Sequence, residues 1–433
     1  MRSVNQYYAN LTHTLPNGYV PTHPTSPFLC LTSFSSLTVL SPTYALTHFR
    51  TYMNFSLSSH QDSLREHIRS FVETEIKPVA LEFDESQEFP SEIFRKLGDL
   101  GYLGIVMPPE LGGSGLGYME YAIIVEEVAR GCPAMALGVA AHNGLCTSHI
   151  FRFGSDEIRQ KYVPRLASGE TLGAWGLTEP GAGSDAGGTR TTAVRDGDEW
   201  ILNGSKNFIT HGNVGEIAVV MAVTDASKGS KGISAFAIDK SMPGFFPSKK
   251  ENKVGMRCSD TASLTFDNVR VPASHLLGNE GEGFLQALQI LDGGRVSIAA
   301  LSVGLAQGAF EAALTYSVER EQFGKRLGDM QAIQFKLARM SMEIQASRDL
   351  TYRAAWLRDE GRPFSREASQ AKLFASEVAV RTAEDAVQIH GGYGYIKEYP
   401  VEKFWRDSKL LTIGEGTSEI QKIVIARSLL ASI

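Results

Sequence analysis

The chain has 433 residues, 43% of them hydrophobic and 21% charged, with a formal net charge of −6. These values predict a soluble globular protein of two or three domains, and the negative charge argues against a general nucleic-acid binder. We find no apolar run long enough to span a bilayer, so no stable membrane insertion is expected. The cysteines, at positions 30, 132, 146 and 258, lack metal-ligand spacing, so we expect no metal site and a reducing compartment.

Residues 1–52 differ from the rest of the chain. No Asp or Glu occurs before Asp62, Ser, Thr and Pro are common, and only Arg2 and Arg50 carry a fixed positive side-chain charge. A transit peptide shares the lack of acids but is also Arg-rich and amphipathic. We therefore expect a dispensable extension outside the core, with the protein proper starting at Met53. That interpretation implies a bacterial cytoplasmic protein, whereas a transit peptide would imply the mitochondrial matrix.

The next two regions differ in their apolar pattern. Residues 53–173 are predicted to form an N-terminal helical domain, because apolar residues such as Leu64, Ile68 and Phe71 recur at helical spacing. Residues 174–280 are predicted to form a middle antiparallel β domain, because short β-rich runs alternate with turn pairs. Alternating β and α units are absent, so a doubly wound sheet is disfavoured.

Residues 281–433 return to a helical pattern. Ile333, Leu337, Met340 and Ile344 form one apolar stripe, and short joints containing Gly or Pro separate the long helical runs. This pattern predicts a C-terminal helical bundle. The whole chain is therefore expected to have an α+β multidomain fold with the order helical, β, helical.

Two segments of the middle region are candidates for contact with a ligand. Residues 181–186 imitate a dinucleotide fingerprint, but no strand and helix flank them, so a loop that approaches a cofactor through its backbone is favoured. Further on, Asn203–Gly204 predicts a turn that delivers Phe208 and Thr210 to one side of a strand. That pair could stack on and hydrogen-bond a flat heterocycle, although an ordinary entry loop and a core strand would look similar.

The helical C-terminal region contributes three more candidate segments. Residues 320–327 combine Arg, Gln and Phe, which suit a phosphate and a base, although a charged helix end is the alternative. Residues 388–394 place glycines after a helix, either to approach a pyrophosphate or as a plain helix stop. In residues 413–421, Glu415 lies between two glycines before a helix start, where Ser418 and Gln421 predict a capping box. Glu415 is thus accessible to a flat ligand, or it is simply a solvated acid.

Five segments resemble, in order and spacing, those of the acyl-CoA dehydrogenase family: 177–185, 203–210, 320–327, 388–394 and 415–421. Each segment alone is weak, but five in register are hard to produce by chance. The resemblance covers roughly residues 53–433. The short-chain, butyryl-CoA-type branch is the most similar one, through residues 203–204, 232–236 and 291–295. The family implies an N-terminal helical domain, a middle β domain and a C-terminal four-helix bundle.

The resemblance also implies FAD, bound non-covalently across the subunit interface of a homo-oligomer, with a tetramer expected. The positions that match flavin-binding residues of the family are Trp175, Leu177, Thr178, Ser184, Phe208, Ile209 and Thr210. The positions that match residues holding the ADP part of a neighbouring subunit's FAD are Arg320, Phe323, Gln331, Gln388, Gly391 and Gly392. Thr417 and Glu419 match cofactor contacts beside the base.

Glu415 matches the catalytic base of the family. A carboxylate of raised basicity is suited to abstract the proton α to a thioester, while the β-hydrogen leaves as hydride to the flavin. The backbone N–H of the base and a ribityl hydroxyl would bind the oxyanion. The positions that match residues near the substrate are Ser184, Asp292, Arg295 and Gly416.

Three positions bear on how closely the chain follows the family. Phe208 stands where many members carry Trp, which keeps an aromatic face. Gly414 stands where many carry Tyr, so the acyl chain length is open. In the isovaleryl-type branch the base precedes the Arg of the substrate helix; here that residue is Gly294, so Glu415 has no competitor.

The expected function is the FAD-dependent dehydrogenation of a short- or branched-chain acyl-CoA to its trans-2-enoyl-CoA in fatty acid β-oxidation. Electrons would pass to electron-transfer flavoprotein. An acyl-CoA oxidase, with oxygen as acceptor, is the first alternative. A low-activity nucleic-acid-associated member of the same fold is the second, and the negative net charge argues against it. A nicotinamide dehydrogenase is disfavoured by the failed fingerprint.

Overall fold

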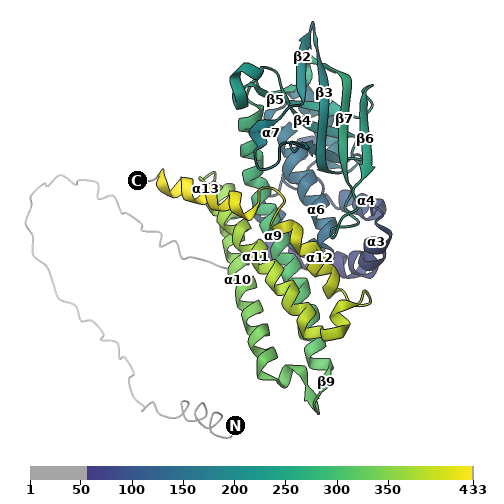
Figure 1. Cartoon of the computed structure of the whole chain (residues 1–433), viewed down its shortest axis with the longest axis vertical. Helices are drawn as coiled ribbons and strands as arrows, with labels where there is room; N and C mark the ends of the chain where they lie inside the picture. The colour runs from purple at the N-terminus through teal and green to yellow at the C-terminus, as the bar shows by residue number, and fades with distance from the viewer. Residues whose placement is uncertain (1–55, 432–433) are drawn as a thin grey trace, which may run out of the picture. The chain divides into compact units, whose positions relative to one another are not determined.

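The computed structural model describes residues 56–431 (Figure 1). The predicted extension at 1–52 lies outside these residues, so its dispensability stays a prediction. The described chain begins with helices, continues with strands and ends with helices. That order and the predicted fold class are confirmed.

The N-terminal helices start and stop at recognisable residues. Ser58 caps the first of them and forms a capping box with Gln61, and Pro133 opens a helix at a position where its missing N–H costs nothing. A π-helical segment, His142–Thr147, follows that helix, and such segments are common near functional sites. The helices are α2 (Ser59–Phe71), α3 (Ala80–Ser86), α4 (Ser91–Asp99), α5 (Tyr118–Gly131), α6 (Pro133–Ala141), α7 (Ser148–Phe153) and α8 (Asp156–Ala167).

The middle region forms one sheet with the strand order β6-β7-β3-β2-β4-β5-β8. Its strands are β1 (Gly173–Gly176), β2 (Thr192–Asp196), β3 (Glu199–Thr210), β4 (Ile217–Val223), β5 (Ile233–Asp239), β6 (Phe245–Lys250), β7 (Thr261–Pro272) and β8 (Leu276–Leu277). Most pairs are antiparallel as predicted, but β4 pairs in parallel with both β1 and β2. Odd-numbered residues of β4 face the α7–α8 core and even-numbered ones a core between strands, as a period of two requires.

One predicted turn of this sheet is wrong. Asn203–Gly204 does not join two strands; it lies inside β3, at a register shift against β7. Gly204 has a φ of +143°, so it permits the irregular backbone there. Pairing along the length of β7 therefore overrides the local hairpin signal.

The C-terminal helices form a bundle around one long central helix. Its members are α9 (Gly283–Glu319), α10 (Gln331–Asp359), α11 (Ser365–His390), α12 (Val401–Leu411) and α13 (Ser418–Leu430). The predicted stripe on α10 is confirmed, since Met340 and Ile344 are buried and Ile333 and Leu337 pack on the core. One hydrophobic cluster joins this bundle to the N-terminal helices, so the two helical regions share a core.

Helix α9 is also long and apolar enough, by length and composition, to cross a membrane, a feature that our search for apolar runs missed. Of its most apolar window, 78% is buried inside the protein. Its apolar character is therefore explained by its place at the centre of the shared core.

Candidate active site

Glu415 lies on the short loop between α12 and α13. Its φ is +51° and that of Gly416 is +94°, so two successive residues adopt the left-handed region that L-residues other than glycine rarely occupy. Helix α13 is capped by Thr417, whose hydroxyl accepts from the N–H of Ile420, and not by Ser418 as predicted. Gln421 instead donates to the carbonyl oxygens of Glu415 and Gly416, at 3.3 and 3.0 Å.

The carboxylate of Glu415 points at Gly294, in the N-terminal half of α9. The residue is half-buried, but its Oε2 is buried and finds no hydrogen-bond partner among the described residues. A Cβ built on Gly294 would lie 1.9 Å from that oxygen and 3.2 Å from Leu145 Cδ2. Only glycine at position 294 therefore leaves room for the observed side chain.

Burial also decides the charge of this group. It raises the pKa of Glu415 from 4.5 to about 7, because a desolvated carboxylate loses the hydration that stabilises its negative charge. The positive charges of Lys372 and, more weakly, Arg295 act in the opposite direction. A carboxylate with a pKa near neutrality can accept and release protons at physiological pH, as a general base must.

Apolar and aromatic side chains surround the space in front of Glu415. Ala141, Leu145 and Ile290 form a small buried cluster, against which the half-buried Trp175 packs. Tyr121 is fully buried and donates from its hydroxyl to the carbonyl oxygen of Ala140 at 2.7 Å. The space is therefore walled by groups that exclude water rather than solvate it.

Two predicted substrate residues meet beside this site. Arg295 is 5% exposed and forms an ion pair with Asp292, whose Oδ1 also accepts from Ser365 Oγ at 2.9 Å. Arg295 Nε is buried without a partner among the described residues. Gly416 lies on the Glu415 loop itself. Ser184 is exposed on the loop after β1, and no contact joins it to Glu415.

The residues predicted to flank a flavin come together around β1 and β3. The carbonyl oxygen of Thr178 accepts from Asn207 N at 2.8 Å, which ties the loop after β1 to the bulge of β3. Phe208 is 65% exposed with a φ of +58°, while Leu177 and Ile209 are buried. An exposed aromatic ring on strained backbone is suited to receive a flat ligand.

The residues predicted to bind the ADP part begin elsewhere: Arg320 ends α9 next to β9 (Glu321–Gln322), and β9 lies at the end of the bundle far from the sheet (Figure 1). Phe323 is 93% exposed, and Arg320 stacks over Tyr393 at 5.4 Å. Gly391 and Gly392 are exposed, with open space where a Cβ would lie. The other predicted members, Gln331 and Gln388, are also exposed, as is Glu419 beside the base, whereas Thr417 is half-buried.

Three residues of the site escaped the sequence analysis. Lys372 is fully buried and donates from Nζ to the carbonyl oxygen of Gly416 at 2.7 Å. The hydroxyl of Tyr121 lies close to Gly144, and buried His149 accepts from Trp175 Nε1 at 3.0 Å. Lys372 alone left a sequence signal, since it interrupts the apolar stripe that Ala368, Ala371 and Ala375 form on α11.

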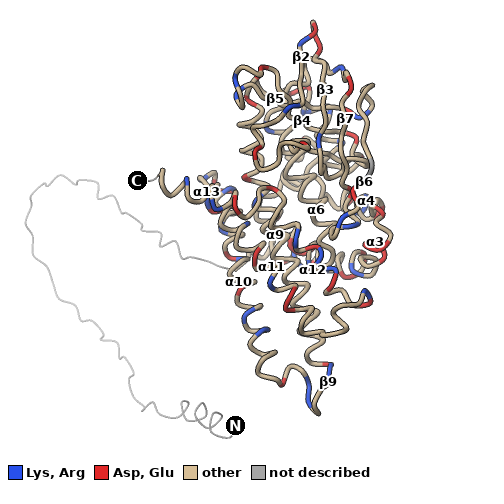
Figure 2. The backbone as a smooth tube through the Cα atoms, in the orientation of Figure 1, with Lys and Arg blue, Asp and Glu red and all other residues tan. Residues whose placement is uncertain are grey.

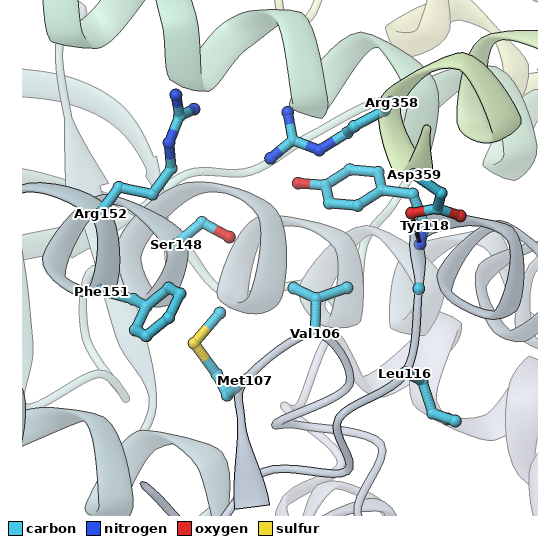
Figure 3. Close-up of a pocket in the computed structure, with 10 residues that line it drawn as sticks. Val106, Met107, Leu116, Tyr118, Ser148, Phe151, Arg152, Arg358 and Asp359 are labelled. Carbon is cyan, nitrogen blue, oxygen red and sulfur yellow. Dashed lines mark hydrogen bonds between the residues drawn. The ribbon is translucent and has the colours of Figure 1, made fainter. Parts of the chain in front are cut away.

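A pocket of about 220 Å³ opens close to this site (Figure 3). The guanidinium groups of Arg152 and Arg358 lie on one side of it, and Val106, Met107 and Phe151 on the other. Its lining does not include Glu415. The hydroxyl of Tyr118, another lining residue, would lie 2.8 Å from a Cβ on Gly293. The pocket is therefore adjacent to the Glu415 site along α9.

Comparison with known proteins assigns the N-terminal, middle and C-terminal regions of the described chain to one family. Models of the acyl-CoA dehydrogenase N-terminal, middle and C-terminal domains match residues 58–170, 174–269 and 281–430. The chain belongs to the acyl-CoA dehydrogenase family. It is therefore an oxidoreductase of that family, as predicted.

Similar proteins indicate which branch of the family this chain resembles. The short-chain specific acyl-CoA dehydrogenase of Clostridium acetobutylicum is 46% identical over 374 residues, 86% of this chain and 99% of that protein. The butyryl-CoA dehydrogenase structure from Megasphaera elsdenii has a TM-score of 0.86 and 43% identity, covering 87% of this chain and 100% of the other. A chain in a solved structure described as the electron transferring flavoprotein of Acidaminococcus fermentans has a TM-score of 0.86 and 45% identity, with the same coverage of both chains. The predicted resemblance to the short-chain branch is confirmed.

Proposed function

We propose that this acyl-CoA dehydrogenase oxidises a short-chain acyl-CoA to its trans-2-enoyl-CoA and that Glu415 is the base. The observation that carries the proposal is the carboxylate of Glu415, held on strained backbone, enclosed against Gly294 and lacking a hydrogen-bond donor to Oε2. Its pKa of about 7 leaves a large fraction ionised at neutral pH. An unpartnered, basic carboxylate in an apolar site is what abstraction of a weakly acidic α-proton requires.

The residues of the middle domain fit FAD. Trp175, Phe208 and Thr210 would flank the flavin ring, and the loop around Ser184 would approach its phosphates through backbone N–H groups. The glycines at 181 and 183 leave open space where a Cβ would stand, which permits that approach. When bound, FAD would supply the acceptor for the β-hydride.

The protein's own groups would prepare the substrate for proton loss. Within the described chain the N–H of Glu415 has no hydrogen-bond partner, so it is available to a thioester oxygen. Asp292 and Arg295 would lie near the bound substrate, since they are one helical turn or less from Gly294 on α9. The apolar walls would keep water from the α-proton.

Tyr121 supports a short acyl group. A Cβ on Gly144 would lie 2.8 Å from the Tyr121 hydroxyl and 3.7 Å from Ser297 Oγ, and Ser297 in turn bonds to Gly294. Tyr121 therefore occupies volume close to Ser297, one turn of α9 from the Gly294 that faces the proposed base. Gly414, by contrast, has only ordinary contacts with Leu410, so the other side of the loop offers space for a branch.

The same proposal includes a homotetramer. Strand β9 (Glu321–Gln322), which directly follows Arg320, lies far from β3, which carries Phe208, so the two halves of an FAD site would have to come from different subunits (Figure 1). Large apolar side chains exposed near that end, such as Phe323 at 93% and Tyr395 at 85%, would be covered in the assembly.

Electron-transfer flavoprotein is the proposed electron acceptor. The similarity to a chain from work on such a flavoprotein supports it, and oxygen is the acceptor to be tested against it. Basic and acidic residues are interspersed over the described chain (Figure 2), which gives no support to a nucleic-acid role.

The test follows flavin bleaching after anaerobic mixing with butyryl-CoA. The purified protein should release FAD, rather than FMN, on acid extraction. Glu415→Gln should keep FAD but slow bleaching by at least ~10²-fold, because Gln cannot accept a proton. Glu398→Gln, an exposed acid with no ion pair among the described residues, is the control and should match wild type. Bleaching of Glu415→Gln within a few-fold of wild type would place the base elsewhere.

A further inference from the structure

Lys372 is the most unusual buried group near Glu415 that the proposed chemistry does not use. Its side chain is completely inaccessible to solvent, on a face of α11 made of Ala368, Ala371 and Ala375. A lysine is almost never fully buried without a carboxylate partner, because its ammonium must be desolvated. Yet no carboxylate lies within ion-pair distance of Lys372 in the described chain.

The ammonium is instead directed at the loop that carries Glu415. Lys372 Nζ donates to the carbonyl oxygen of Gly416 at 2.7 Å, and Gln421 Nε2 donates to the same oxygen at 3.0 Å. Two donors from two helices thus fix the peptide that follows Gly416, and Gln421 also holds the carbonyl oxygen of Glu415. This anchoring explains how Glu415 can keep a left-handed φ of +51°, a conformation that costs free energy.

We infer that Lys372 is the positioning residue of this site: it anchors the Glu415–Gly416 backbone and supplies the positive charge that keeps the Glu415 carboxylate ionised. The inference rests on the proposed role of Glu415 as the base. Lys372 itself touches neither the reacting atoms nor the proposed cofactor residues, so it acts through the loop.

The other charged and titratable groups around Glu415 support this assignment. Arg295 faces it from α9, but its guanidinium is already paired with Asp292. Tyr121 faces it from α5, and burial together with nearby negative charge raises the pKa of its hydroxyl, so it is neutral. From α13, Gln421 contributes only a neutral amide. Lys372 is therefore the one cation facing Glu415 in the described chain that no carboxylate pairs.

The electrostatic effect has a defined direction. Burial lowers the pKa of Lys372 to about 8, so the ammonium is still charged when Glu415, with a pKa of about 7, loses its proton. Removing the charge would raise the pKa of Glu415 further, because nothing else would offset its desolvation to the same degree. At neutral pH a larger fraction of the enzyme would then carry a protonated, inactive base.

The inference is tested by the pH dependence of anaerobic flavin bleaching with butyryl-CoA, from about pH 6 to about pH 9, in FAD-loaded protein. For Lys372→Met we expect the acid limb to move up by about one pH unit. Relative to wild type, bleaching would then be about tenfold slower on that limb than near pH 9, where only the pH-independent decrease from the lost hydrogen bond to Gly416 would remain. Gln421→Leu removes a neutral anchor, so its rate should fall by a similar factor at every pH, without movement of the limb.

Two further variants distinguish loss of the positive charge from a change in packing or loss of a hydrogen-bond donor. Ser376→Ala removes a buried hydroxyl that bonds only to Leu373 in its own helix, so it controls for packing changes in α11 and should leave the profile unchanged. Lys372→Gln keeps a hydrogen-bond donor without charge and should reproduce the shifted limb.

An unshifted limb in Lys372→Met, or loss of FAD in both Lys372 variants, would overturn the inference and leave Lys372 a structural residue. Glu415→Gln is measured in parallel. If that variant still bleaches rapidly, the failure lies in the proposed function rather than in the assignment of Lys372.

Discussion

The strongest quantitative prediction concerns the stability of Glu415→Gln. Burial raises the pKa of Glu415 from 4.5 to about 7, and each pKa unit corresponds to about 1.4 kcal/mol. The ionised carboxylate therefore costs about 3 kcal/mol of folding free energy, which the neutral amide avoids. Because the pKa is raised in the folded state, this cost is absent below about pH 4.5, grows as the pH rises towards 7 and is constant above it.

Glu415→Gln should consequently melt at a higher temperature than wild type at pH 8 and at the same temperature near pH 4.5. For a chain of this size, about 3 kcal/mol corresponds to a shift of about 4 °C. The assay is differential scanning calorimetry at both pH values with saturating FAD, so that cofactor release contributes equally. Glu398→Gln serves as the exposed control. An equal difference at both pH values would show that the Glu415 carboxylate is not desolvated, and the reasoning about the base would fail with it.

Other consequences can be checked independently. Gly294→Ala should retain FAD but lose at least ~10-fold in bleaching rate, because its methyl group would displace the Glu415 carboxylate. Tyr121→Ala should raise the ratio of octanoyl-CoA to butyryl-CoA turnover, whereas Tyr121→Phe should not, since only the change to Ala removes the ring. If Tyr121→Ala had the same ratio as wild type, Tyr121 would not limit the chain length. Burial lowers the pKa of His149 from 6.5 to about 4, so between these pH values the unfolded chain protonates the ring while the folded protein keeps it neutral, and stability falls as the pH is lowered from 6.5 to 4. Over that range the melting temperature of His149→Gln should therefore decrease less than that of wild type. A chain beginning at Met53 should bind FAD and turn over like the full chain, and failure to do so would contradict the interpretation of residues 1–52.

The parts of the fold that the sequence predicted correctly depend on local pattern. The apolar stripe of α10 and the Gly391 stop of α11 are readable because period and helix-ending residues act over a few positions. The position of Glu415 on a loop before a helix could be predicted because its flanking glycines and the helix start lie in one segment, whereas its role as the base stays a proposal. Asn203–Gly204 failed for the opposite reason, since pairing with the distant strand β7 decides its backbone.

The residues that the sequence did not reveal act across helices. In the sequence Lys372 is visible only as an interruption of the apolar stripe of α11, and its contact with the Glu415 loop appears only once α11 packs against that loop. Tyr121 reads as a core aromatic until α5 meets α9. The left-handed backbone of Glu415 was also invisible, because Glu seldom adopts it and nothing local requires it. Long-range packing therefore supplied the electrostatics of the site, whereas local pattern supplied only its position.

With Glu415 as the proposed base, its close approach to Gly294 has a consequence for how this site can evolve. Gly294→Glu alone would place a second carboxylate in space that the first already fills, and two such groups would repel each other or share one proton. Glu415→Gly alone would leave no base. Moving the base from the loop to α9 thus requires both exchanges, and each single step passes through an impaired enzyme. Neither arrangement can therefore be reached from the other through a single substitution that keeps full activity.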